Sequence, residues 1–216
     1  MHIPNGAQIF VESGAGATLT ATAITNAVNP VMTVADTSTI TVGQYVIFES
    51  ATWSKLANRV LRVTAKTETT VTVEGLDTTD LNKFPAGASA TFRAVTSWVE
   101  IPCVQEISSE GGEQNTLTYQ CLSDDFEQSI PTTKSAITLT YTFAHEFDNA
   151  VYPIFRDADE SGDVLAFRMF VPKAGEMRTW SGNLSFSEVP QTSVNEIETV
   201  SISVTLRGRY TFMAAE

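Results

Sequence analysis

The sequence contains few side chains that could catalyse a reaction or bind a metal ion. Its histidines are His2 and His145, whereas a metal site needs several nitrogen, sulfur or oxygen ligands. His145 beside Glu146 could form half of such a site, but no second histidine supports it, so a structural or surface role is favoured. No serine lies in a nucleophile-elbow pattern, and no glycine-rich phosphate loop is present. We therefore predict a protein that is not an enzyme and holds no metal or cofactor.

One acidic run resembles part of a calcium-binding loop. Residues 157–163 alternate acidic side chains before Gly162, as the first half of such a loop does. A bidentate glutamate is needed six residues after that glycine, and Arg168 occupies the position. The pattern is therefore typical of a solvated helix end.

The two cysteines, Cys103 and Cys121, are too few for a disulfide framework or a closed zinc site. They flank the turn-like residues 110–113, and a hairpin centred there would place them almost opposite each other. Disulfides directly across two strands are usually strained, and a cytosolic setting keeps thiols reduced. Two small apolar side chains are the favoured interpretation, with a disulfide as the alternative.

Charge divides the chain into two parts. The net charge of −12 disfavours nucleic-acid binding, because phosphate contacts need clustered Lys and Arg. Residues 18–95 hold six basic and six acidic residues, whereas the remainder holds seven basic and nineteen acidic ones. We predict a small domain at 18–95 inserted into a discontinuous acidic domain at 1–17 and 96–216.

No apolar run is long enough to span a membrane, and the first residues lack the basic and apolar stretches of a secretory signal. We therefore expect the protein to start in a cytoplasm. Thr, Val, Ile and Phe are common, which favours strands. In the neutral block, β-rich runs separated by turn signals predict a small barrel or sandwich. These runs lie at residues 30–34, 45–48, 60–64, 70–73 and 88–94.

Outside the block the sequence predicts further strands and one helix. The strands lie at residues 8–12, 98–108, 116–122, 136–143, 164–171, 176–187 and 199–212. Residues 98–108 and 116–122 are expected to pair as a hairpin. The helix follows Asp148 or Asn149, either of which can cap it, and Gly162 can end it. Its apolar stripe at helical spacing is formed by Val151, Ile154, Phe155 and Ala158.

A series of short motifs follows the neutral block. They lie at residues 98–107, 111–113, 117–119, 137–141, 167–172, 180–182 and 200–208. In this order, and together with the first dozen residues, they resemble the tail tube proteins of phages with long non-contractile tails, the siphophage type. The block at 18–95 departs from the minimal pattern and resembles, more weakly, small β modules within phage structural proteins.

This resemblance implies a mainly β fold, an antiparallel β-sandwich with one flanking helix, to which the small barrel-like domain is added on the outside. It implies hexameric rings stacked into a tube through which DNA is ejected without being bound. It also implies contacts with the tape measure, terminator and tail tip proteins, and a place in the virion tail. An acidic lumen would repel phosphates, although the charge could serve solubility alone. The candidate lumen acids are Glu100, Glu106, Glu110 and Glu113.

The segment 123–134 is acidic and rich in turn-forming residues, so we predict a surface loop. Phe126 and Ile130 are apolar and need a partner surface, which we expect to belong to a neighbouring subunit or ring. The proposed contact residues are Ser123, Asp124, Asp125, Phe126, Glu127, Gln128, Ser129, Ile130 and Pro131.

Two other kinds of protein fit parts of the pattern. The first is another phage structural β protein, such as a tail terminator or a capsid decoration protein. The second is a carbohydrate-binding module with Trp53, Trp98 or Trp180 as a stacking platform, although scattered tryptophans are more often core or interface anchors.

Overall fold

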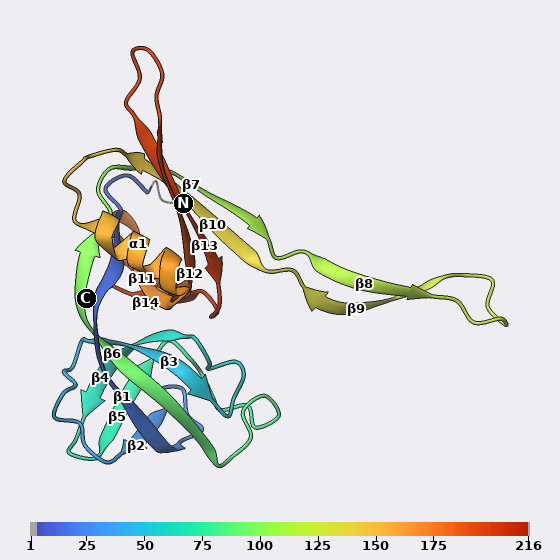
Figure 1. The fold of residues 1–216 in the computed structure, drawn as a ribbon. Helices are drawn as coiled ribbons and strands as arrows, with labels where there is room; N and C mark the ends of the chain where they lie inside the picture. Colours follow the sequence, from blue (N-terminus) through green and yellow to red (C-terminus); the bar gives the residue numbers. More distant parts are fainter. Residues whose placement is uncertain (1–3, 216) are drawn as a thin grey trace.

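The computed structural model describes residues 4–215 and is mainly β, with one α-helix. A 12-stranded antiparallel sheet runs through the body, and β8 and β9 form a separate ribbon that projects from it (Figure 1). The strands are β1 (Gln8–Ile24), β2 (Val31–Val34), β3 (Tyr45–Ala51), β4 (Val60–Lys66), β5 (Thr70–Glu74), β6 (Ala88–Glu100), β7 (Val104–Gly111), β8 (Gln114–Tyr119), β9 (Gln128–Lys134), β10 (Ile137–Ala144), β11 (Val164–Val171), β12 (Glu176–Gln191), β13 (Thr199–Leu206) and β14 (Thr211–Ala214). The helices are α1 (Val151–Ser161) and a short 3-10 turn, η1 (Pro172–Ala174).

The neutral block forms a closed barrel. The strand circuit β1–β2–β5–β4–β3–β6 closes because β2 also pairs with β1. Phe48, Leu61 and Phe92 are fully buried in its core. All five strands predicted between residues 30 and 94 exist. Each places apolar side chains at alternate positions, and this core buries them.

The chain passes between the barrel and the rest of the protein inside strands. The predicted strand at residues 8–12 does not end at the glycines that follow, since β1 continues to Ile24. An added Cβ at Gly14 would lie 2.4 Å from the Ser97 Oγ, so this glycine permits close strand approach rather than a turn. β6 likewise continues past Val95 to Glu100.

The second part of the protein is a sheet folded over its own core. The strand order is β6–β1–β11–β12–β13–β10–β7, and the long β12 belongs to both halves. Tyr141 of β10 stacks on Trp180 of β12 at 6.3 Å, although β13 separates these strands in the sheet. This contact across the core makes the second part a β-sandwich, as the sequence predicted.

Helix α1 covers the sandwich core. The Asn149 side chain accepts a hydrogen bond from the Val151 N–H (3.1 Å), and Gly162 ends the helix with φ 70°. Phe155 packs edge-on against Phe143 of β10 at 6.0 Å. Three residues of the predicted stripe are buried and Ile154 is half-buried; Tyr152, which was not predicted, is buried too.

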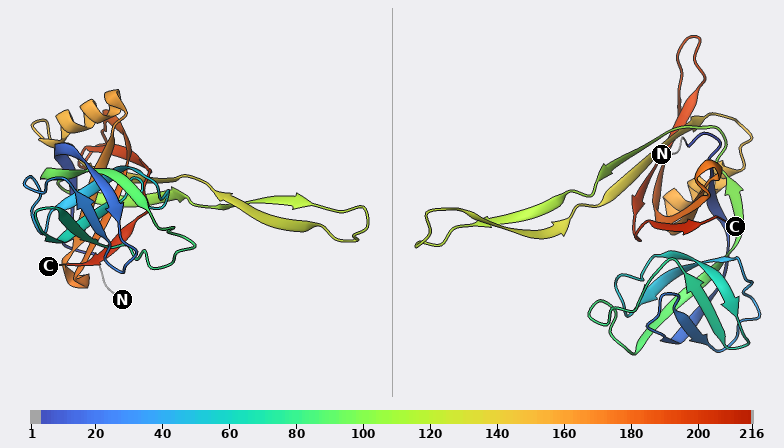
Figure 2. Two further views of the ribbon diagram at one scale, coloured as in Figure 1. Left: turned by 90° about the horizontal axis from the view of Figure 1, so that it is seen from below. Right: turned by 180° about the vertical axis from the view of Figure 1, so that it is seen from behind.

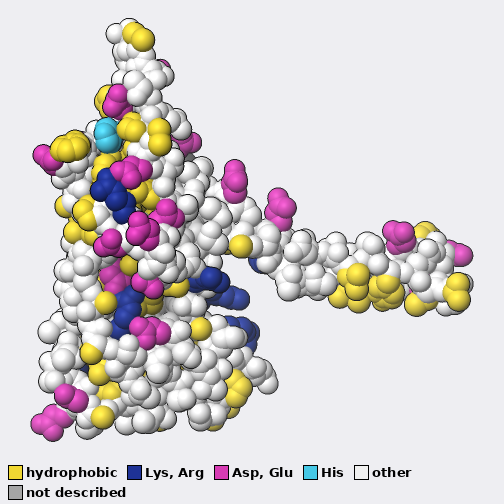
Figure 3. All heavy atoms as spheres, viewed as in Figure 1, with side chains coloured by type: hydrophobic (Ala, Val, Ile, Leu, Met, Phe, Trp, Pro, Cys, Tyr) yellow, Lys and Arg dark blue, Asp and Glu magenta, His cyan; other side chains and the backbone are white. Residues whose placement is uncertain are grey.

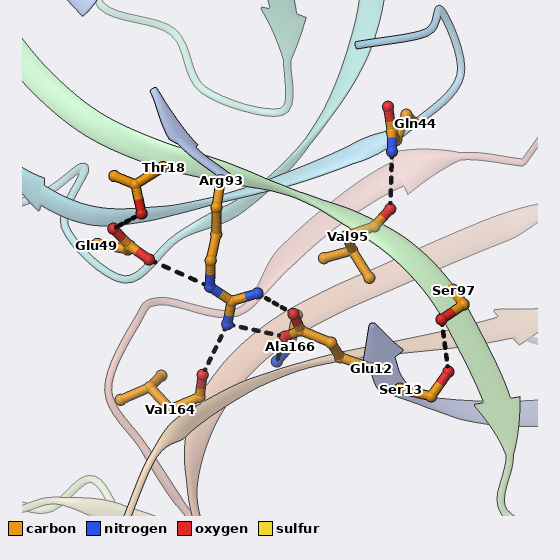
Figure 4. Close-up of polar contacts among 10 residues, drawn as sticks. All are labelled: Glu12, Ser13, Thr18, Gln44, Glu49, Arg93, Val95, Ser97, Val164 and Ala166. Atoms are coloured by element: carbon orange, nitrogen blue, oxygen red, sulfur yellow. Dashed lines mark hydrogen bonds and ion pairs between the residues drawn. The ribbon is translucent and has the colours of Figure 1, made fainter. Parts of the chain in front are cut away.

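A charged joint connects the barrel to the sandwich (Figure 4). Glu12 is 3% exposed, pairs with Arg93, and accepts a hydrogen bond from the Ala166 N–H at 3.0 Å. Arg93 also pairs with Glu49 (3.3 Å) and donates to the Val164 carbonyl (3.2 Å). Every charge in this joint has a partner, so the barrel is held firmly against the sandwich.

Hydroxyl groups of the sandwich add to this joint. The Thr179 and Ser181 hydroxyls, both fully buried, donate to the carbonyls of Val60 and Asn58 in the barrel. The barrel therefore covers the outer face of the β1–β11–β12 half of the sandwich.

The predicted strand 98–108 and its pairing with 116–122 are wrong. The strand is interrupted between β6 and β7. There Pro102 is followed by Cys103, whose backbone adopts the left-handed conformation (φ 47°). β7 pairs with β10, and β8 pairs with β9. The reason lies at Gly111, where an added Cβ would lie 1.9 Å from the Ala136 carbonyl oxygen. The chain does not turn back at this glycine; it continues outward, and its pairing partner changes from β10 to β9.

Three further predictions need correction. The segment 123–134 is not all loop, because Gln128–Lys134 is strand β9. The last strand is interrupted after Leu206 and resumes as β14. The cysteines do not face each other, since Cys103 precedes β7 and Cys121 follows β8; both are free and exposed.

Candidate assembly surfaces

The residues that could have suggested catalysis or ligand binding have structural partners. His145 Nδ1 lies 2.6 Å from the Tyr152 hydroxyl, and the two rings stack. Trp53 and Trp180 are buried and so cannot act as exposed platforms for a sugar. Within residues 4–215, no group of His, Cys, Asp and Glu is arranged to hold a metal ion, and His2 lies outside the described residues.

A hollow of about 620 Å³ opens beside the charged joint, between the barrel and α1. Its polar lining includes Arg93 and two glutamates, Glu12 and Glu49, each of which pairs with Arg93. Burial lowers the pKa of the Arg93 guanidinium, and nearby Asp163 opposes that shift. These groups satisfy each other and hold the joint together.

A long ribbon is the most prominent exposed feature. We call residues 113–134 the arm, comprising β8, the tip at residues 120–127, and β9. It projects away from both the barrel and the sandwich (Figure 2), and all its residues are exposed except the half-buried Asp124. A two-stranded ribbon alone is marginally stable in water, so the arm needs a partner surface.

One side of the arm is apolar. Leu117 lies opposite Ile130 in the ladder, and Tyr119 lies opposite Gln128, so these side chains share a face. At the tip, Leu122 is fully exposed and Phe126 is 82% exposed. Hydrophobic side chains accordingly gather along one side of the arm (Figure 3). Such a patch marks an interaction site.

The sequence-based prediction located part of this surface. Phe126 and Ile130 are exposed apolar residues, as predicted, but Gln128–Pro131 belong to a strand and not to a loop. Leu117, Tyr119 and Leu122 were missed because residues 116–122 were predicted to pair in the core. The paired glycines 111 and 112 were the signal that could have redirected that strand.

The outer face of the β12–β13–β10–β7 half carries three rows of small polar residues across the strands. Reading from β7 to β12, the rows are Glu110–Thr138–Thr205–Asn183, Ser108–Thr140–Ser203–Ser185 and Glu106–Thr142–Ser201–Ser187. The face is neutral except for the two glutamates of β7. The barrel covers the other half of the sandwich, so this face stays open.

The structure separates the four candidate lumen acids. Glu106 and Glu110 lie on this open polar face, and Glu113 is the first residue of the arm. Glu100 lies at the opposite edge of the sheet, on β6, where the Gln8 side chain donates to it at 3.4 Å.

β7 is the edge strand of the sheet and pairs with β10 on one side only. Its residues from Gln105 to Gly111 are exposed. An unpaired strand edge presents free N–H and C=O groups that can pair with another chain. The open polar face, the free edge and the apolar arm are therefore three surfaces suited to self-association.

Comparison with known families agrees with this picture. A family model described as phage tail tube protein matches residues 51–215, so it includes part of the barrel as well as the sandwich. No curated protein matches the chain. Within residues 4–215, no helix has the length and apolar character to cross a membrane. Members of this family are structural components of the virion tail, and the chain belongs to the family of phage tail tube proteins.

Proposed function

We propose that copies of this chain form hexameric rings that stack into the tail tube, with the open polar face turned to the lumen through which DNA is ejected. The observation that carries this proposal is the set of three polar rows on four adjacent strands, beside a free strand edge. Edge-to-edge pairing of copies would continue these rows around a ring.

The dimensions agree with such a ring. Four strands from each of six copies, about 4.8 Å apart and tilted about 40°, give a barrel roughly 48 Å across at the backbone. Small side chains on the inner face leave room for a DNA duplex. The barrel of each copy covers the opposite outer face of the sandwich, which favours a position outside the tube.

The chemistry of the rows suits a channel for DNA. Hydroxyl and amide groups carry no charge, so passing phosphates would release no counterions and would not be held. Glu106 and Glu110 add negative charge that repels phosphate. The rows themselves contain no Lys or Arg; the arginine at their border, Arg207, donates to the Asn183 side chain.

The apolar side of the arm supports stacking or lateral contact between copies. Burying each large apolar side chain contributes roughly 1.5–3 kcal/mol, and the contact repeats at every subunit. We further propose that assembly takes place in the host cytoplasm and involves the tape measure, terminator and tail tip proteins, as the family resemblance implies.

Electron microscopy of the purified chain tests this function. Hollow tubes or stacked six-fold rings are the expected result. Trimers, or single rings that never stack, would refute it and favour a decoration or terminator protein.

A further inference from the structure

Three arginines gather at the junction of barrel and sandwich. The Arg207 main-chain N–H donates to the Ser181 carbonyl (3.0 Å), and the Ser181 hydroxyl donates to the Asn58 carbonyl. This brings residues 207–209 against residues 58–59. An added Cβ at Gly208 would lie 1.8 Å from that same Asn58 oxygen, so the glycine is required for the approach. We call Arg59, Arg207 and Arg209 the arginine cluster.

The arginine cluster has no carboxylate partner among the described residues. Arg207 Nε donates to the Asn183 side chain, and Arg59 reaches the Gly75 carbonyl at 3.5 Å. The Arg59 Nε is buried and makes no hydrogen bond. Burial, and then the nearby charge of Arg209, lower the pKa of Arg59. An unpaired cluster of like charge is unfavourable alone, and it stands out in a chain of net charge −12.

The arm has the opposite character. Residues 104–133 contain six acidic residues and no Lys or Arg. Three of the acids, Asp124, Asp125 and Glu127, lie in the tip beside Phe126. From Gly112 to the tip the ribbon is roughly 35 Å long at about 3.3 Å per residue, and it points away from its own body (Figure 2).

We propose that the arm tip of one copy docks on the arginine cluster of a second copy, with its three carboxylates as the anions that the arginines bind. This inference rests on the proposed tube and names the receptor of the arm. Arginine forms bidentate hydrogen bonds with carboxylates, and the interface is head-to-tail, so each copy gives an arm and receives one.

The length of the arm fits this receptor. Four strands about 4.8 Å apart and tilted about 40° give each copy a width of roughly 25 Å at the lumen, so a ribbon of roughly 35 Å extends past its own borders to a neighbour. DNA is the rival anion. A second copy is favoured because the arm tip supplies three carboxylates, whereas Arg207 touches only the first polar row, through Asn183; the DNA measurement below separates the two.

Charge reversal tests the pairing on the full chain. The first variant is Arg207→Glu with Arg209→Glu, and the second is Asp124→Arg, Asp125→Arg and Glu127→Arg. Each alone should remain folded by circular dichroism and should raise the critical concentration for tube formation more than about tenfold. Both sets combined in one chain should restore assembly. Lys173→Glu, an exposed basic residue on η1, is the matched control and should assemble normally.

Several outcomes would overturn the proposal. Normal tubes from either reversed variant, or no rescue in the combined variant, would do so. Binding of a short DNA duplex that is lost only in the arginine variant would assign the cluster to nucleic acid instead. If the wild-type chain makes no tubes, the proposed tube is refuted, but the pairing of arm tip and arginine cluster can still be tested by sedimentation. A mixture of the two reversed variants should associate, whereas each variant alone should stay monomeric.

Discussion

Replacing both Phe126 and Ile130 with serine should give a folded subunit that polymerises poorly. Both residues lie on the arm, outside every buried cluster, so the fold does not depend on them. Phe126 is 82% exposed and Ile130 48% exposed in the single chain. Only the exposed part of each side chain can be newly buried on assembly.

Full burial contributes roughly 1.5–3 kcal/mol per large apolar side chain, so the exposed parts of these two together contribute roughly 2–4 kcal/mol per contact. That corresponds to a rise in critical concentration on the order of 30- to 700-fold. Sedimentation over a concentration series measures this rise directly, with circular dichroism as the check on folding.

A matched control distinguishes the arm from exposed apolar residues in general. Val42 and Leu81 of the barrel are 58% and 59% exposed, so Val42→Ser with Leu81→Ser removes a comparable area elsewhere. The control should assemble like the wild type. Tubes of normal length and an unchanged critical concentration from the arm variant would refute the reasoning. Attention would then turn to the exposed β12–β13 hairpin, where Val189 and Val194 are 80% and 89% exposed.

Further predictions concern the core, the joint, the lumen and alkaline pH. Leu139→Ser should unfold the subunit, because Leu139 is 8% exposed and its loss costs about 2–5 kcal/mol, as urea denaturation would register. Glu12→Ala should cost up to about 3–5 kcal/mol, because it removes the buried partner of Arg93 and leaves the Ala166 N–H without its acceptor; urea denaturation measures this cost, and an unchanged midpoint would contradict the role of the joint. Ser203→Arg with Thr140→Arg should make assembled tubes retain a short DNA duplex in a salt-sensitive way, whereas the same positions changed to Asp should not; equal DNA binding by both variants would move the lumen to another face. Burial raises the pKa of Tyr210 from 10.0 to about 12, so the folded state keeps its proton where the unfolded state loses it. The resulting stability should be complete below about pH 10 and fall as pH rises toward about 12, and Tyr210→Phe should flatten that fall in thermal melts.

The sequence predicted elements whose residues alternate around one core. Residues 136–143 and the barrel strands follow period two, and the helix stripe follows period 3.6, so local pattern and burial agree. The barrel was also recognised by its neutral charge. Its treatment as a separable domain remains a proposal, because β1 and β6 continue from it into the sandwich. We expect a variant lacking residues 18–95 to be less stable than the full chain, since Glu12 would lose Arg93 and the buried Thr179 hydroxyl would lose its acceptor.

The arm could not be predicted because its pattern is that of an ordinary core hairpin. Leu117, Tyr119 and Ile130 alternate as buried residues would, yet nothing in the single chain covers them. The face on which a strand residue lies depends on its pairing with the neighbouring strand. At Gly111 the pairing strand changes from β10 to β9. The arginine cluster was missed for a related reason: Arg59 and Arg207 are far apart in sequence and meet only through the contact between Gly208 and Asn58.

Electron cryomicroscopy of the assembled chain tests the central claim most directly. We expect a hollow tube of stacked six-fold rings, with the rows around Thr140 and Ser203 facing a lumen of duplex width and the barrels outside. A tube whose channel is lined by the barrels or by helix α1, or an assembly without a channel, would contradict the account.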